Sequence, residues 1–250
     1  MFHSIIIPHR KRRQHLLQCI ASVRRSADCC KETDWEIVIV DNSRTALPES
    51  TQEERVRVVG DPQNGSIYNK AKALNLGIQH ARGDALTFLD ADAVVGLRFI
   101  TGARQLLTGD CDRVCYRVRT MIDGQDIAKS PNAPIAYEAY GRWDNNLRDP
   151  NCGLQPWGNS QFSILRESLG DIRYDEFYEG RGYEDLDMNM QLWAKFGNQY
   201  RGIIFTDPES AMVHLHSPGA DPSWNSHDAK MRSLEHYRNK MLQVLAEASA

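Results

Sequence analysis

The sequence predicts an α/β domain whose sheet is mainly parallel and flanked by helices, and two observations support this. Short apolar runs bounded by turn or charged residues occupy positions 4–7, 36–40, 56–59 and 85–89, as expected of buried strands. Amphipathic segments with helical spacing alternate with these runs. Their apolar stripes consist of Leu16, Ile20, Val23 and Ala27, and of Ile67, Ala71, Leu74, Ile78 and Ala81. In such a fold, ligands bind at the carboxyl ends of the strands.

The chain as a whole fits one domain. Its 250 residues, of which 41% are hydrophobic, are enough to bury a single sizeable core. From 123 to 155 the pattern gives way to Asp, Asn, Pro and Gly, which is typical of a functional irregular segment. Order returns at 157–165, and we expect a helix from about Glu184, a strand at 211–216 and a C-terminal helix.

Composition restricts the partners and the location. A formal net charge of −3 gives no overall basic field, so nucleic acid is not expected as a partner. Six cysteines without a CxxC pair suggest thiols kept reduced in the cytoplasm. The N-terminal apolar run is too short for a signal peptide, and no stretch approaches the roughly 20 apolar residues of a membrane span. We therefore expect a soluble cytoplasmic protein.

A basic cluster in the first helical segment suggests peripheral contact with the inner face of the membrane. Its members are Arg10, Lys11, Arg12, Arg13, Arg24 and Arg25. Near an anionic surface, each Lys or Arg contributes on the order of 1 kcal/mol. The alternative is an ordinary solvated helix face.

The most informative segment is an apolar strand that leads directly into the acids of Asp90-Ala91-Asp92. Strand alternation would direct both carboxylates to the same side. Two hard oxygen donors in this position suit Mg²⁺ or Mn²⁺ and leave coordination sites for phosphate oxygens. The alternative is a pair of solvated acids at a strand end.

Three further segments resemble known glycosyltransferases. Residues 4–12 and 68–78 resemble the opening strand and central helix of β-1,4-galactosyltransferases, and residues 36–43 resemble the second strand of family 2 glycosyltransferases. Both groups share the GT-A fold, a nucleotide-binding α/β sheet with a metal-binding DxD. The resemblance implies contact with the nucleotide sugar by Pro8, Arg10, Arg12, Asp41, Lys72, Asp90 and Asp92. Of these, Asp41 would contact the base, Lys72 the phosphates, and Asp90 and Asp92 the ribose and metal.

The second half is similar to the acceptor module of the galactosyltransferases. Residues 157–160 and 178–188 match it, and a Gly-rich loop leads there to a Glu-Asp pair at a helix start. An ionised carboxylate is favoured at a helix N-terminus. We expect Asp185 as general base, with Glu184 and Asp187 holding acceptor hydroxyls, and further acceptor contacts from Trp157, Gly158 and Asn159. Arg181 stands where the galactosyltransferase loop has a tryptophan, and N-terminal capping charges are the alternative.

A histidine pair completes the predicted site. On a strand, His214 and His216 share a face, so both could point at one ion. The family has a histidine metal ligand in about this position, and the sequence does not decide between the two.

Together, these segments predict a single GT-A domain over residues 1–250, with a C-terminal extension on the acceptor side. Residues 1–122 form its nucleotide-sugar half, 123–217 its acceptor half, and 218–250 a helical extension. The expected activity is metal-dependent, inverting transfer from a UDP-sugar to a hydroxyl of a glycan or lipid-linked sugar, with Mn²⁺ or Mg²⁺. A sugar nucleotidyltransferase is one alternative, but residues 8–13 contain no glycine for its phosphate loop. A binding module without turnover is the other.

Overall fold

The computed structural model describes most of the first half of the chain and the helices of the second half. The described residues are 1–43, 47, 54–63, 68–109, 113–116, 118–120, 142–143, 161–180, 182–196, 202–205, 212–214 and 227–248. In chain order, their helices and strands are β1 (His3–His9), α1 (Arg13–Cys29), β2 (Trp35–Asp41), β3 (Val56–Gly60), α2 (Lys70–His80), β4 (Ala85–Phe88), β5 (Ala93–Val95), α3 (Phe99–Thr108), β6 (Arg113–Tyr116), β7 (Val118–Thr120), β8 (Arg142–Trp143), β9 (Phe162–Leu165), α4 (Arg166–Leu169), α5 (Glu184–Phe196), β10 (Gly202–Phe205), β11 (Met212–His214) and α6 (His227–Ala248).

Among the described residues, seven strands form the main sheet, in the order β10-β6-β9-β4-β1-β2-β3. β1 pairs in parallel with β2 and β4, and β2 pairs in parallel with β3. β9 runs antiparallel to its neighbours β4 and β6, while β6 and β10 are parallel. The expected α/β fold with a mainly parallel sheet is confirmed, and the four predicted strands of the first half are β1 to β4.

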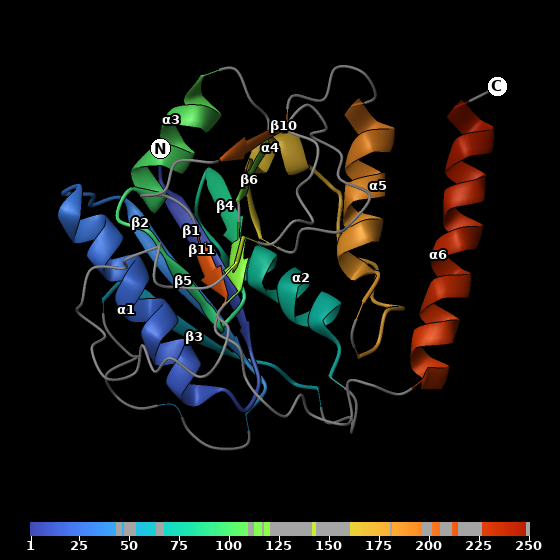
Figure 1. Cartoon of the computed structure of the whole chain (residues 1–250), viewed down its shortest axis with the longest axis horizontal. Coiled ribbons are helices and arrows are strands. Elements are labelled where there is room, and N and C mark those ends of the chain that lie inside the picture. Colours follow the sequence, from blue (N-terminus) through green and yellow to red (C-terminus); the bar gives the residue numbers. More distant parts are fainter. Residues whose placement is uncertain are drawn as a thin grey trace.

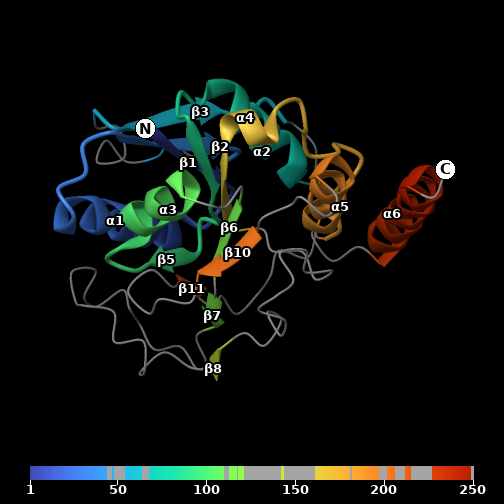
Figure 2. The ribbon, with the colours of Figure 1, turned by 90° about the horizontal axis from the view of Figure 1, so that it is seen from above.

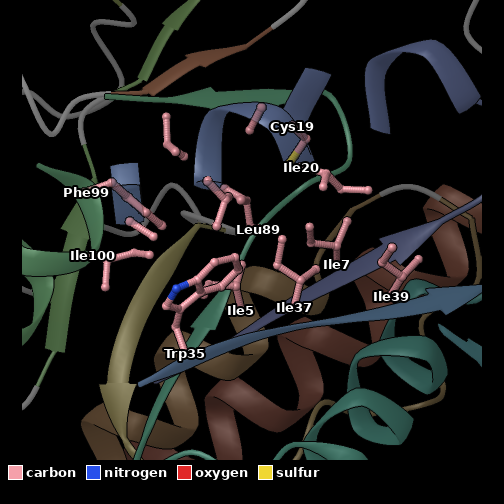
Figure 3. Close-up of a cluster of buried hydrophobic side chains, with 14 of the residues drawn as sticks. Ile5, Ile7, Cys19, Ile20, Trp35, Ile37, Ile39, Leu89, Phe99 and Ile100 are labelled. Atoms are coloured by element: carbon pink, nitrogen blue, oxygen red, sulfur yellow. The ribbon is translucent and has the colours of Figure 1, made fainter. Parts of the chain in front are cut away.

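The sheet separates two cores because successive side chains of a strand point to opposite faces. Ile5 and Ile7 of β1 pack with α1 and α3 on one face (Figure 3), in a cluster that includes Leu16, Cys19, Ile20, Ile37, Phe99 and Ile100. The intervening Ile6 faces the other core, with α2 and α5, in a cluster that includes Val38, Leu74, Ile78, Phe88, Met188 and Leu192. Helices therefore cover both faces, as predicted.

α2 crosses close to β1 because position 77 is a glycine. A Cβ on Gly77 would overlap the side chain of Ile6. At the other end of the helix, Asn69 is the N-cap, and its side-chain oxygen accepts the N–H of Lys72 at 2.9 Å. Cap and close packing together fix the place of Lys70, the first residue of α2.

A smaller sheet, in the order β5-β11-β7-β8, lies beside the main one (Figure 2). β11 pairs antiparallel with β5, and His214 stands opposite Ala93. The backbone of His214 is therefore next to the residue that follows Asp92. The strand expected at 211–216 is present as β11, and His216 lies outside the described residues.

α5 and α6 lie side by side at one end of the molecule (Figures 1 and 2). α6 is the C-terminal helix expected from the sequence. Within the described part of the chain, no helix combines the length and the apolar character that a membrane crossing requires. Of the segment 123–155, which we expected to be irregular, only β8 is described.

Candidate active site

The carboxyl ends of the parallel strands β1 to β4 meet at one edge of the main sheet, where ligands are expected. In the register of the sheet, His9 stands opposite Asp41, and Asp41 stands opposite Gly60. β4 ends at Phe88, so the segment Asp90-Ala91-Asp92 begins at the same edge. The topology thus brings together Asp41 at the end of β2 and the acids that follow β4, although about 50 residues separate them in sequence.

Asp41 is an anion held in one orientation. The Nδ1 atom of His9 lies 2.8 Å from Oδ1, and Ser43 donates its N–H at 3.0 Å and its hydroxyl at 2.7 Å. Burial disfavours the charged carboxylate, but these hydrogen bonds outweigh burial and keep the pKa of Asp41 below its usual value. A fixed carboxylate at this edge is suited to accept an N–H group from a base.

Asp61 lies beside Asp41 and was not selected from the sequence. Its N–H donates to the carbonyl oxygen of Asp41 at 2.9 Å. Gln63 donates its N–H at 3.0 Å and its side-chain amide at 2.7 Å to the Asp61 carboxyl, but burial still raises the pKa of this group, helped by the charge of Asp41. Its place directly after β3 was the signal that could have identified it.

Asp90 and Asp92 lie in a turn and not on a strand. β4 stops at Phe88, and the N–H of Ala93 donates to the carbonyl oxygen of Asp90 at 3.0 Å. The argument from strand alternation therefore does not apply to these two carboxylates, because alternation holds only in extended backbone. The two acids meet different cations: Asp92 is buried and pairs with Arg12, and Asp90 pairs with Lys70.

The other predicted nucleotide contacts are distributed around this edge. Pro8 is buried in β1. The guanidinium carbon of Arg10 lies 5.7 Å from the centre of the Tyr68 ring, a cation–π distance. The Lys72 side chain is exposed on α2, where its charge acts on Asp61. The structure thus brings Arg12 to the acids after β4 and leaves Lys72 on the open side of α2.

Lys70 is the residue that links the two predicted halves of the site, and sequence reasoning missed it. Its Nζ atom lies 2.8 Å from Oδ1 of Asp90 and 3.9 Å from Oε1 of Glu184, and its side chain is only 16% exposed. Burial alone would lower the pKa of Lys70, but attraction from Asp185, Asp90 and Glu184 raises it well above its usual value. One partly buried cation therefore joins acids from the turn after β4 and from α5.

The first turn of α5 carries Glu184, Asp185 and Asp187, as predicted. The loop before it contains three residues with positive φ: Gly180 (79°), Gly182 (107°) and Tyr183 (72°). Glycine adopts this conformation freely, whereas a tyrosine in it is strained. The Tyr183 carbonyl then accepts the N–H of Asp187 at 2.8 Å, so the strained residue forms the first hydrogen bond of the helix turn.

Asp187 is placed differently from the other two acids. Its side chain is 0% exposed, and Lys240 of α6 lies 2.6 Å from Oδ1. Tyr178 donates its hydroxyl at 3.2 Å and Gln191 its amide at 2.6 Å. These contacts use both carboxylate oxygens within the protein, so the acceptor contact expected of Asp187 has no exposed oxygen to use in this arrangement.

The acids after β4 suit a divalent cation by residue type. Carboxylates are the hard ligands that Mg²⁺ and Mn²⁺ prefer, and imidazole also binds Mn²⁺. β11 brings the backbone of His214 opposite Ala93. No cluster of three or more His, Cys, Asp or Glu side chains suited to an ion occurs within the described ranges. The donor types fit, and the choice between His214 and His216 stays a prediction.

Four predicted site residues lie outside the described residues: Trp157, Gly158, Asn159 and His216.

The sequence profile of glycosyl transferase family 2 matches residues 4–162, which contain β1 to β4, Lys70 and the acids after β4. The chain belongs to glycosyl transferase family 2. The resemblance to this family inferred from the strand at 36–43 is thereby confirmed. A comparison with curated proteins finds no match for this glycosyltransferase.

Solved structures of S. aureus TarS share the fold of this glycosyltransferase. TarS 1–349 in complex with UDP-GlcNAc superposes with a TM-score of 0.63 at 12% identity, over 91% of this chain and 62% of TarS 1–349. The complex with UDP gives a TM-score of 0.59 at 16% identity, over 87% of this chain and 61% of TarS 1–349. A further structure of TarS gives 0.60 at 16% identity, over 96% of this chain and 43% of that TarS chain. The chain therefore spans about three-fifths of the length of TarS 1–349. The match confirms the predicted GT-A fold.

Proposed function

We propose that this family 2 glycosyltransferase moves a sugar from a UDP-sugar to a hydroxyl group of a glycan or lipid-linked sugar, with inversion at the anomeric carbon. One observation carries the proposal: Lys70 lies 2.8 Å from Asp90 and 3.9 Å from Glu184. Residues of the predicted donor side and acceptor side thus share one partly buried cation. A donor bound beside Asp90 and an acceptor bound beside Glu184 would then be held near each other, and such proximity can supply a large part of a rate enhancement.

The donor side uses the carboxyl edge of β1 to β4. Asp41, fixed by His9 and Ser43, is an acceptor for the N–H of uracil, and cytosine has no N–H in that ring position. Arg10 and Arg12 supply positive charge for the diphosphate, with Pro8 and Lys72 bordering the nucleotide. Two TarS structures, in complex with UDP and with UDP-GlcNAc, support a uridine donor for a chain of this fold.

The transfer step is a single displacement. Asp185 takes the proton of the acceptor hydroxyl, and the acceptor oxygen attacks the anomeric carbon on the side opposite the diphosphate. The bond between the anomeric carbon and the β-phosphate oxygen breaks, and its electron pair leaves with UDP. Glu184, held by Lys70, orients the acceptor sugar. Attack from the opposite side inverts the anomeric configuration.

We assign a divalent ion, Mn²⁺ or Mg²⁺, to Asp90, Asp92 and one of His214 and His216. When bound, the ion would stabilise the charge that develops on the departing diphosphate. Arg12 pairs with Asp92, so its guanidinium stands beside one of these proposed ligands. The residue types on these segments and the register of β11 with β5 support the assignment.

The acceptor side and the location complete the proposal. Trp157, Gly158 and Asn159 would contact the acceptor sugar together with Glu184. A cytoplasmic enzyme whose basic cluster lies in and just before α1 could work on a lipid-linked acceptor at the inner membrane face. Co-sedimentation with liposomes tests the proposed membrane contact. Binding should increase with anionic lipid content, and binding independent of anionic lipid would contradict the membrane contact.

Hydrolysis and transfer assays test the central proposal. The chain is incubated with a panel of UDP-, CDP- and GDP-sugars, with Mn²⁺, with Mg²⁺ or with EDTA, and free nucleoside diphosphate is measured. We expect release of UDP from one or more UDP-sugars with metal and little with EDTA. A chain that binds UDP but releases it from no UDP-sugar would be a binding module. Formation of a nucleotide sugar from UTP and a sugar phosphate would indicate the nucleotidyltransferase instead.

A further inference from the structure

The C-terminal helix α6 contacts the loop and the helix turn that carry the acids of the acceptor side. Nζ of Lys240 lies 2.6 Å from Asp187 and 2.8 Å from Asp175. Burial opposes the charge of Lys240, but the bonds to the two carboxylates raise its pKa above the usual value. Because Asp187 is 0% exposed, its charge depends on this partner and on its hydrogen bonds for compensation.

A second group of contacts connects α6 with the segment before α5. His236 stacks on Phe177 with ring centres 4.0 Å apart, and its Nε2 atom lies 2.9 Å from Asp175. Tyr178 meets the same imidazole edge-on, and its hydroxyl donates to Asp187. The contacts of Asp187 and Asp175 thus form one continuous network across α5, α6 and the loop.

A third contact reaches the strained residue of the loop. The ring of Tyr237 lies 5.8 Å from the ring of Tyr183, which has a φ of 72° and directly precedes Glu184. A non-glycine residue in this conformation persists only where surrounding contacts support it. Tyr237 supplies such a contact to Tyr183, directly before the first residue of α5.

Lysines of two other helices, α2 and α6, therefore contact the first turn of α5. Lys70 of α2 lies 3.9 Å from Glu184, and Lys240 of α6 lies 2.6 Å from Asp187. Asp185 stands between these two acids in the sequence. A shift of the turn by a fraction of its diameter would displace all three carboxylates together, because they belong to one rigid helix turn.

We infer that α6 is a brace for the first turn of α5, and that Lys240 and Tyr237 are positioning residues for Asp185 and Glu184. The inference rests on the proposed function for the roles of those two acids. Neither positioning residue contacts substrate in this scheme. They act by keeping Tyr183 and Asp187 in place, and through them the backbone of the turn.

The test measures turnover and local order in the same full-length variants. Lys240→Met removes the charge and keeps the length of the side chain, and Lys230→Met is the matched control, because Lys230 is exposed on the same helix. Hydrolysis of UDP-GlcNAc with Mn²⁺ gives kcat and KM, calorimetry gives the affinity for UDP, and amide hydrogen exchange reports on residues 178–190.

We expect Lys240→Met to lower kcat by about 10- to 100-fold, in the range reported for small misplacements of catalytic groups. The affinity for UDP and the KM for UDP-GlcNAc should change little, and Lys240→Arg should recover most of kcat. Hydrogen exchange of the α5 turn should increase in Lys240→Met and remain unchanged in Lys230→Met. A destabilised fold alone would lower active protein and leave kcat per folded molecule unchanged.

Tyr237 provides the second pair of variants. Tyr237→Phe keeps the ring contact with Tyr183 and should behave as wild type, whereas Tyr237→Ser should lower kcat and increase exchange at the turn. Unchanged exchange in both Lys240→Met and Tyr237→Ser would overturn the brace. Wild-type protein that binds no UDP and hydrolyses none of the panel of UDP-sugars would overturn the proposed function instead, and increased exchange in Lys240→Met would still support the brace.

Discussion

Lys70 and Asp90 form an ion pair with 2.8 Å between Nζ and Oδ1, at the point where α2 begins and the turn after β4 leaves the sheet. The same ammonium group is 3.9 Å from Glu184. Removing this cation would leave carboxylates from two segments close together with less compensation. Such like-charge repulsion in a poorly solvated place moves the groups apart or protonates one of them.

We therefore expect Lys70→Met to lower turnover by about 100-fold or more, since both donor and acceptor groups lose their common partner. Lys70→Arg should restore part of the activity because it keeps the charge. Steady-state hydrolysis of the preferred UDP-sugar measures both, with the exposed Lys230→Met as the charge-removal control. Full activity in Lys70→Met would show that the two sides of the site do not depend on their shared cation.

Metal dependence is the second prediction, and it concerns Asp92. Asp92→Asn removes a hard anionic ligand, so Mn²⁺ should no longer strengthen UDP binding, and turnover should be lost. Calorimetric titration of UDP with and without Mn²⁺ checks this, and thermal unfolding checks that the variant is folded without its Arg12 ion pair. Asp28→Asn, on the exposed face of α1, is the control. Activity that persists in EDTA would contradict the prediction.

The fold of the first half was predictable because each strand is short, apolar and followed by a helical stripe. The strands at 4–7, 36–40, 56–59 and 85–89 emerged from hydrophobicity alone, and their parallel order places Asp41 and Asp90 at one edge. The smaller sheet was only partly predictable. The strand expected at 211–216 is β11. Its partner β5 was not predicted, because it is only three residues long and lies in a run that also suits a helix. The pairing of β5 with β11 joins segments that are far apart in the sequence, so local patterns do not reveal it.

The candidate site was predictable where a residue ends a strand and unpredictable where partners come from other elements. Lys70 could not be distinguished from Lys72 by sequence, because both stand in the first turn of one helix. What separates them is tertiary: Lys70 is 16% exposed beside Asp90, and Lys72 is exposed. Asp187 likewise carries the same helix-start signal as Asp185, but α6 supplies Lys240 as its partner.

Base recognition by Asp41 is the third prediction. UDP should bind more tightly than CDP, because a carboxylate accepts the N–H of uracil and meets an acceptor atom in cytosine. Asp41→Asn should reduce the preference for UDP over CDP by about 10-fold. This factor corresponds to the loss of roughly 1.4 kcal/mol from one charged hydrogen bond. Competition binding of the two nucleotides to wild type and variant measures it. Equal affinities in the wild type would remove Asp41 from the base site.

The network of α6 leads to a prediction about pH and stability. Burial would raise the pKa of Asp175, but the bonds from His236, Lys240 and the N–H of Phe177 lower it to about 2. An unfolded aspartate has a pKa near 3.9. Because the folded pKa is the lower one, the charged form stabilises the fold fully above about pH 5, and this stabilisation is lost as pH falls through 4 toward 2.

The unfolding free energy of wild type should therefore exceed that of Asp175→Asn at pH 5, and the difference should shrink steadily to pH 2.5. Urea titrations at a series of pH values measure it. Asp171→Asn, a change at an exposed neighbouring acid, should show a small difference throughout. A constant difference between wild type and Asp175→Asn over this range would mean that the carboxylate does not stabilise the contact with α6 through its charge.

The roles of Asp185 and Glu184 are separable by substitution, although both acids act on the Lys70 ammonium: Glu184 lies 3.9 Å from it, and the charge of Asp185 helps to raise its pKa. Asp185→Asn keeps the size of the side chain but cannot take up a proton, so kcat should fall by about 100-fold or more while UDP affinity is maintained. Glu184→Gln keeps the hydrogen-bonding shape and weakens the ion pair. The Glu184→Gln variant should raise the KM for the acceptor more than it lowers kcat, because Glu184 orients the sugar in the ground state and in the transition state alike.

Steady-state kinetics of both variants, on the acceptor that the transfer assay identifies, decide between the assignments. A large loss of kcat in Asp185→Asn together with a KM effect in Glu184→Gln supports Asp185 as the base. The reverse pattern would make Glu184 the base, with Lys70 as its neighbour 3.9 Å away. Near wild-type kcat in both variants would show that the proton acceptor does not lie in α5. The three acids in the first turn of that helix would then need another explanation.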